Sequence, residues 1–134
     1  MRKLHKTNNS YVLTYDVRPD FTLNKERSVH HMVRAKITKE WRQAFCELAK
    51  DAMLPSMEQI EVVVQPYLLA AKYRQDVGAC FPQTKAAIDG LVDAGVLIDD
   101  NAKIVLKLTF LAPLYGKDAL ELTITEVALP TPLD

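Results

Sequence analysis

The sequence predicts one compact α+β domain with a mixed β-sheet of about four strands and two main helices. The 134 residues are enough for a single hydrophobic core. Apolar residues recur at helical spacing in two segments, and four other segments are strand-like. The order β-α-β-α-β-β places the last two strands next to each other along the chain, which favours a hairpin at the end of the domain.

The first half of the chain is expected to hold a strand, a long loop and a helix. Tyr11 to Val17 alternates as a strand does. Residues 18–36 have no clean period and are rich in basic and imidazole groups, which predicts a long loop of the functional kind. A helix is expected from Lys39 to Met53, with Thr38 as its N-cap.

The second half begins with a β-branched strand from Ile60 to Leu68. The next helix starts near Pro82, which suits a first-turn position, and ends at Gly95 in the manner of a left-handed C-cap. Two further strands are expected over Ala102–Leu111 and Ala119–Val127, followed by an irregular tail over residues 128–134.

The net charge is zero, but the charges are unevenly distributed along the chain. Residues 1–50 hold eleven lysines and arginines against five acidic residues, a difference of +6, and the rest of the chain has the opposite difference of −6. This asymmetry fits one basic face for a polyanion and one acidic pocket for a metal, or simply two solvated faces that differ.

No apolar run is long enough to span a membrane, and the basic start is not followed by the apolar segment of a secretory signal. We therefore expect a cytoplasmic protein without a membrane partner. Cys46 and Cys80 are too few for a zinc site or a disulfide framework, and we expect both to be small buried apolar residues.

Three aspartates flank the second predicted helix. Asp76 precedes it, and Asp99 and Asp100 follow it. If the fold or a dimer brings these connections together, the carboxylates repel unless a cation neutralises them. Mg²⁺ or Mn²⁺ suits such an all-oxygen site and can activate water for phosphodiester hydrolysis, with Lys85 near the phosphate. The alternative is that the sequence "IDDN" only forms a turn.

The run "KAAIDGLVDAGVLIDD" (Lys85 to Asp100), with "LELTITEV" (Leu120 to Val127), resembles the RusA family of Holliday junction resolvases. In that family a D-x-D-N motif precedes a helix that opens with K-A-A and ends at A-G before a D-D pair. The spacing from the lysine to the pair agrees without a gap. Upstream, Thr22 to Phe45 is similar to the Asn- and Arg-containing loop and first helix of phage members.

The resemblance implies a RusA-like homodimer that uses Mg²⁺ to resolve four-way DNA junctions by paired nicks. It assigns Asp76, Asp99 and Asp100 to the metal and the catalytic site, and Lys85 to catalysis; of the aspartate pair, Asp100 is the better candidate for direct ligation. Mn²⁺ can take the place of Mg²⁺ in such oxygen-ligand sites.

The sequence departs from the family pattern at Gly78, where the family has its second aspartate. Gln83, Asp89 or a backbone carbonyl are the alternatives for the missing ligand. A second hypothesis is therefore a junction-binding protein that kept the fold and lost the chemistry. A third, an unrelated α+β binding domain, requires the match from Lys85 to Asp100 to be accidental.

Basic residues in the predicted loop and before Asp76 are the candidates for contact with DNA phosphates, which give affinity without reading sequence. The alternative for each is a solvated surface charge. Trp41 and Phe45 are expected in the core rather than stacked on bases. The candidate DNA-binding residues are Lys25, Arg27, His31, Arg34, Lys36, Lys72 and Arg74.

Overall fold

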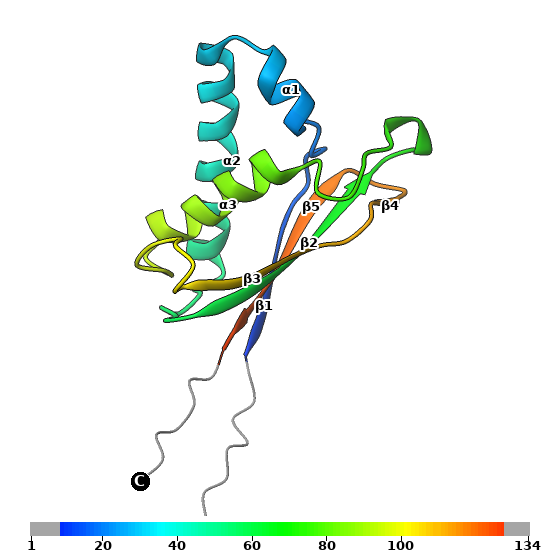
Figure 1. The fold of residues 1–134 in the computed structure, drawn as a ribbon. Coiled ribbons are helices and arrows are strands. Elements are labelled where there is room, and N and C mark those ends of the chain that lie inside the picture. The colour runs from blue at the N-terminus through cyan, green and yellow to red at the C-terminus, as the bar shows by residue number, and fades with distance from the viewer. Residues whose placement is uncertain (1–8, 128–134) are drawn as a thin grey trace, which may run out of the picture.

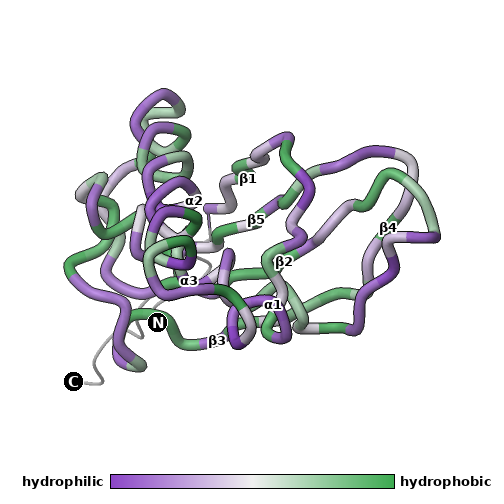
Figure 2. The backbone as a smooth tube through the Cα atoms, turned by 90° about the horizontal axis from the view of Figure 1, so that it is seen from above, coloured by the Kyte–Doolittle hydropathy of each residue, from purple (hydrophilic) through white to green (hydrophobic). Residues whose placement is uncertain are grey.

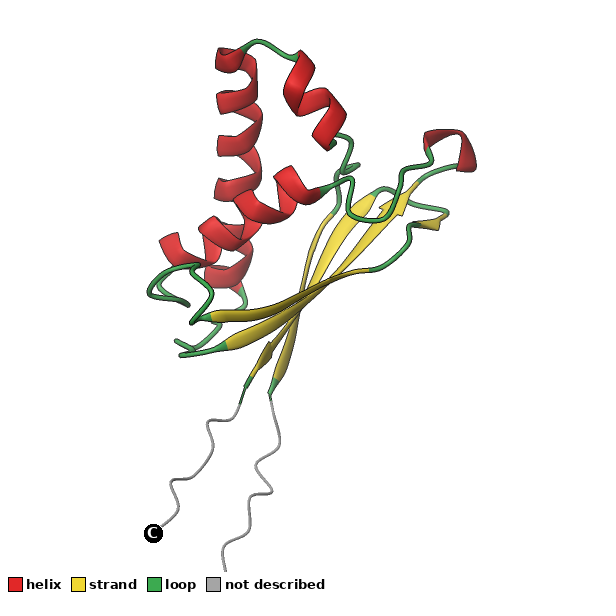
Figure 3. Cartoon of the chain, viewed as in Figure 1, coloured by secondary structure: helices red, strands yellow, loops and turns green. Residues whose placement is uncertain are grey.

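The computed structural model describes residues 9–127 of the chain, which form a five-stranded sheet with helices packed against it (Figures 1 and 3). This confirms the predicted α+β class and the mixed sheet. The elements in order are β1 (Ser10–Tyr15), α1 (Leu23–Ser28), α2 (His31–Asp51), β2 (Ile60–Leu68), the 3₁₀ turn η1 (Ala71–Tyr73), α3 (Phe81–Asp93), β3 (Val105–Phe110), β4 (Leu114–Tyr115) and β5 (Ala119–Glu126).

The strand order is β1-β5-β2-β3, with the short β4 paired to β2. β5 is antiparallel to both β1 and β2, whereas β3 and β4 are parallel to β2. The predicted hairpin between the last two long strands is therefore wrong. β2 reaches β3 through α3, because parallel neighbours need a crossover connection, and β5 then returns to the middle of the sheet.

The core lies between one face of the sheet and the helices α2 and α3. Along β2 and β5, buried apolar residues alternate with more exposed ones, and the register pairs Val62 with Ile124 and Val64 with Leu122. From α2, Trp41 and Phe45 enter the same core, as predicted. Figure 2 shows the corresponding alternation of hydrophilic and hydrophobic stretches along the helices.

Helix α3 crosses α2 (Figure 1), and the two helices come into close contact. The contact is made at Gly90: a Cβ there would lie 2.9 Å from the Cys46 backbone nitrogen and closer still to the Arg42 carbonyl oxygen. Only glycine fits this crossing without moving a backbone. Gly90 thus determines how near the outer side chains of α3 lie to those of α2.

The predicted long loop over residues 18–36 is largely helical, and Lys39 is not where the following helix begins. Thr22 caps α1 by accepting a hydrogen bond from the Lys25 nitrogen at 3.4 Å, and His30 caps α2 by accepting one from the Met32 nitrogen at 3.2 Å. Helix α1 buries no residue, so it has no apolar period to detect. Thr38 lies inside α2 rather than at its start.

The predicted limits of α3 are confirmed. Pro82 occupies its first turn, and Gly95 follows its C-cap with a φ of +83°. Cys80 is buried as expected, whereas Cys46 is only half-buried at the α2 surface. The predicted tail over residues 128–134 lies outside the described residues.

The end of the sheet that carries η1 and β4 extends beyond the helices (Figures 1 and 2). Arg18 ties this end together: its guanidinium donates to both Asp118 oxygens, at 2.9 and 3.0 Å, and lies 3.6 Å from the centre of the Tyr73 ring. Asp118 also accepts from the Leu69 nitrogen at 2.9 Å. These bonds anchor the segment that leads from β2 to Asp76.

None of the helices in the described part of the chain combines the length and the apolar character that crossing a bilayer requires.

Candidate functional site

The segment after α3 turns back toward the helix because its first two apolar residues are buried. Val96 and Leu97 are 2% and 3% exposed, and the Val96 carbonyl accepts a hydrogen bond from the Met57 nitrogen at 2.8 Å. The Gly95 carbonyl accepts from the Ser56 hydroxyl at 3.1 Å. The chain that follows therefore runs beside α3 and carries its aspartates to the outer side of the helix.

Lys85, Asp89 and Asp100 form what we term the lysine–aspartate cluster. The Lys85 ammonium donates to Asp89 Oδ1 at 3.0 Å and to Asp100 Oδ2. Lys85 and Asp89 are one turn apart on α3, so the helix itself makes them neighbours. Asp100 comes from the returning segment. Half of the Lys85 side chain is exposed, against about a quarter of each carboxylate, so the cluster is open to solvent on the lysine side.

Two carboxylates share one ammonium, and their pKa values separate. The hydrogen bond from Lys85 lowers the pKa of Asp100 to about 2. Burial, with the nearby Asp100, raises the pKa of Asp89. Partial burial opposes the charge of Lys85, but its bonds to Asp100 and Asp89 prevail and raise the pKa of the ammonium. Opposed shifts of this kind often accompany functional sites, although structural ion pairs also produce them.

Asp99 serves the turn rather than the cluster. Its Oδ1 accepts from the Asp100 nitrogen at 2.7 Å, and its Oδ2 accepts from the Asn101 side chain at 3.3 Å. Asn101 Oδ1 in turn accepts from the Lys103 nitrogen at 2.9 Å. This is the turn-forming role that the sequence "IDDN" allowed. Of the two adjacent aspartates, Asp100 contacts Lys85.

Asp76 lies in a different place, in the exposed segment between η1 and α3. It lines a pocket of about 580 Å³ with Asn24 and Arg74. Its side chain makes no hydrogen bond or ion pair with the lysine–aspartate cluster. The structure thus brings Lys85 and Asp100 together but leaves Asp76 outside that contact.

The departure at Gly78 has a backbone reason. Gly78 has a φ of +83°, a conformation that L side chains rarely adopt, and its carbonyl accepts from the Phe81 nitrogen at the start of α3. An aspartate at this position would strain the backbone, although there is open space for its Cβ. The segment before α3 is therefore built for glycine at this point.

For a metal, the donor chemistry fits and the arrangement fits only in part. Carboxylate oxygens are the ligands that Mg²⁺ prefers. Within residues 9–127, however, no three His, Cys, Asp or Glu side chains are grouped as a metal site requires. The ammonium of Lys85 lies where Asp89 and Asp100 converge.

The candidate DNA-binding residues fall into two groups. One lies on α1 and the start of α2, and the other lies at η1 and just after it. Arg34 is half-buried and donates to the Glu26 carbonyl at 3.0 Å, whereas the others are exposed. The first group is Lys25, Arg27, His31, Arg34 and Lys36; the second is Lys72 and Arg74.

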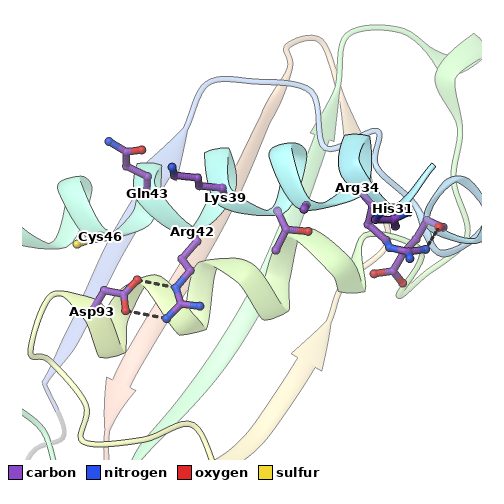
Figure 4. A pocket seen from close by; sticks show the side chains of 10 residues that line it. His31, Arg34, Lys39, Arg42, Gln43, Cys46 and Asp93 are labelled. Atoms are coloured by element: carbon purple, nitrogen blue, oxygen red, sulfur yellow. Dashed lines mark hydrogen bonds and ion pairs between the residues drawn. The ribbon is translucent and has the colours of Figure 1, made fainter. Parts of the chain in front are cut away.

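A groove of about 750 Å³ beside α2 was not predicted from the sequence (Figure 4). Lys39, Arg42 and Gln43 line it together with His31 and Arg34. Its lining follows α2 at intervals of three and four residues, a signal hidden by placing residues 31–36 in a loop.

At one end of this groove, Arg42 donates to both oxygens of Asp93 on α3, at 2.6 and 2.8 Å. Asp93, with weaker contributions from Asp89 and Asp100, raises the pKa of Arg42. Arg42, at this end of the groove, therefore lies within electrostatic reach of the lysine–aspartate cluster.

No protein-family model matches the chain, and no curated protein matches it at a significant level.

Proposed function

We propose that the protein is a Mg²⁺-dependent endonuclease that cleaves branched DNA by hydrolysing phosphodiester bonds. The observation that carries the proposal is the contact between Lys85 and Asp100. These residues are fifteen positions apart and are the two that the resemblance to RusA resolvases assigns to catalysis with most specificity. Their meeting on the open side of α3 is compatible with a site that receives a phosphate.

The proposed roles follow from charge and exposure. The Lys85 ammonium has three donors, of which Asp89 and Asp100 accept two, so one remains to bind a phosphate oxygen. Asp100, kept ionised by Lys85, is the principal metal ligand, with Asp76 and Asp99 as the further carboxylates. Bound Mg²⁺, or Mn²⁺ in its place, would neutralise the phosphate and lower the pKa of a water molecule.

This assignment requires rearrangement before all three aspartates share a metal. Asp99 would have to release its turn bonds, and the segment that carries Asp76 would have to approach α3. Asp100 needs no such movement. We therefore expect substitution of Asp100 to be at least as damaging as substitution of Asp76 or Asp99.

The remaining parts of the proposal concern the partner. Lys25, Arg27, His31, Arg34, Lys36, Lys72 and Arg74 are proposed to contact the DNA backbone, and their exposure supports this for all but Arg34. A homodimer is proposed because two symmetric nicks in a two-fold junction require two sites.

The test is cleavage of a labelled synthetic four-way junction with Mg²⁺ or Mn²⁺, next to a linear duplex of the same sequence. We expect paired nicks on the junction alone and a loss on the order of 100-fold or more in Asp100→Asn. Asp51→Asn, at the exposed last residue of α2 and outside the lysine–aspartate cluster, is the matched control and should cut normally. Cleavage by Asp100→Asn at the wild-type rate would refute the assignment.

A junction-binding protein without nuclease activity is the second candidate, favoured by Gly78 and by the separate position of Asp76. Tight binding of the junction with no cleavage in either metal would select it. Thermal unfolding with and without Mg²⁺ separates the two further. A metal-dependent rise in Tm that disappears in Asp100→Asn supports the nuclease, because only a bound ligand stabilises the native state in this way.

A further inference from the structure

We propose that Asp89 is a positioning residue that holds the Lys85 ammonium in its working orientation beside Asp100. The inference rests on the proposed function and gives Asp89, which the sequence offered only as one alternative for the missing metal ligand, a role toward Lys85. Asp89 lies one turn after Lys85 on α3 and accepts a hydrogen bond from its ammonium at 3.0 Å.

The helix makes Asp89 the more rigid of the two carboxylates. Asp89 is placed by the hydrogen-bonded backbone of α3, next to the buried residues Ile88 and Gly90. Asp100 lies in an irregular segment that follows Gly95. A lysine has a flexible four-carbon stem, so its ammonium has no fixed direction without partners. The hydrogen bond to Asp89 fixes the position of the Lys85 ammonium beside Asp100.

Two of the three N–H groups of the Lys85 ammonium are held by hydrogen bonds, and these bonds orient the third N–H. With one hydrogen of the ammonium on Asp89 and another on Asp100, rotation about the terminal carbon–nitrogen bond is restricted, and the remaining N–H has a defined direction. Without Asp89, the ammonium would be free to turn about its bond to Asp100. The remaining donor would then no longer be aimed at a phosphate.

Asp89 also pairs with the Lys85 ammonium, which would otherwise pair with Asp100 alone. An ammonium paired with one carboxylate neutralises it, and a neutralised Asp100 is a poorer ligand for a cation. With Asp89 taking one donor of the ammonium, Lys85 bonds Asp100 through Oδ2, and Asp100 Oδ1 makes no bond to Lys85. The arrangement therefore keeps both members of the proposed site, lysine and aspartate, available.

Asp93 provides the matched control, because it lies one turn further along α3 and is also half of an ion pair. Its partner is Arg42, and it makes no ion pair with Lys85 within the described residues. Asp89→Asn and Asp93→Asn thus remove the same charge from the same helix. Only the first takes a charged partner from Lys85, because an amide oxygen can accept a hydrogen bond but carries no negative charge.

The first measurement does not depend on nuclease activity. The rate at which an amine-acylating reagent modifies Lys85 is followed by mass spectrometry in the folded full chain. Loss of Asp89 frees the amine, so we expect the rate to rise about twofold or more in Asp89→Asn and to stay at the wild-type value in Asp93→Asn. An unchanged rate in Asp89→Asn overturns the inference.

The second measurement is steady-state cleavage of the synthetic junction. We expect kcat to fall on the order of tenfold or more in Asp89→Asn with KM nearly constant, since a misdirected donor affects the transition state more than binding. Asp89→Glu should recover part of the loss, and it is the second variant if Asp89→Asn unfolds. Equal kcat in the wild type and Asp89→Asn overturns the inference while the proposed function stands.

Failure of the proposed function gives a different result. If the wild type does not cut the junction in Mg²⁺ or Mn²⁺, the nuclease proposal fails whatever the acylation rates are. The rates then decide separately whether Asp89 positions the lysine.

Discussion

The inner face of α3 packs small and apolar residues against α2 and the sheet, whereas its outer face carries charged side chains that contact one another. On the inner face, Ala87 and Leu91 are fully buried, and Gly90 meets the α2 backbone. On the outer face, Lys85 and Asp89 are one turn apart and partly exposed. A single helix of thirteen residues thus serves both the fold and the candidate site.

The two faces are expected to respond differently to substitution. The inner face is closely packed, so adding one methyl group at Gly90 would displace the backbone of α2 or of α3. The side chains of the outer face are partly exposed, so a substitution that removes a charge there alters ion pairs more than it alters packing. The comparison therefore predicts unfolding from inner substitutions and altered chemistry from outer ones.

The largest expected effect is on the inner face, from Gly90→Ala. Its Cβ would press on the Arg42 carbonyl and the Cys46 nitrogen, so we expect the free energy of unfolding to fall by about 3 kcal/mol. Helix propensity alone predicts the opposite sign, a gain of about 1 kcal/mol. Chemical denaturation measures the change. A variant more stable than the wild type would show that α2 and α3 are not in this close contact.

Gln83 breaks the pattern of the inner face, because it is a polar residue only 1% exposed. Neither its amide nitrogen nor its amide oxygen has a hydrogen-bond partner within the described residues. An unsatisfied buried amide is costly, so we expect Gln83→Met to raise the free energy of unfolding by about 1 kcal/mol. Denaturation of the two proteins in parallel measures it. A loss of stability would instead mean that the amide is satisfied in solution.

The smallest expected effect is on the outer face, at the pair of Asp93 with Arg42. The hydrogen bonds from Arg42 lower the pKa of Asp93 in the folded protein. Its stabilisation is therefore present above the unfolded pKa, about 3.9, and is lost as the pH falls below it. Because both side chains are partly exposed, we expect at most about 1 kcal/mol.

Thermal unfolding of the wild type and Asp93→Asn between pH 7 and pH 3 measures this contribution. The gap in Tm between the two proteins should be widest at neutral pH and should close toward pH 3. A gap that does not depend on pH would show that Asp93 stabilises through packing rather than through its charge.

Much of the local structure could be predicted from the sequence. Pro82 and Gly95 mark the two ends of α3, and the spacing of Trp41 and Phe45 places them in the core. These features depend on residues a few positions apart, and such neighbours determine caps and periodicity. Helix α1 escaped prediction for the same reason, since it buries nothing and has no period.

The sequence predicted which residue types form the candidate site, but not how they are arranged in space. The sequence indicated Lys85 and Asp100 as candidate site residues, but not that Asp99 would be bonded within its own turn or that Asp76 would line a separate pocket. It offered Asp89 only as an alternative metal ligand, because the place of Asp89 beside Lys85 and Asp100 depends on where Asp100 returns to α3. Each of these outcomes depends on the path of a connection through space.

The sequence by itself determined which segments are helices and strands in the core and which of their residues are apolar, because that information is local. Only the tertiary structure decided that β5 lies between β1 and β2, that β3 is parallel to β2 and that Lys85 meets Asp100. Such pairings join residues distant along the chain. They are selected by the free energy of packing the whole core, in which every segment contributes at once.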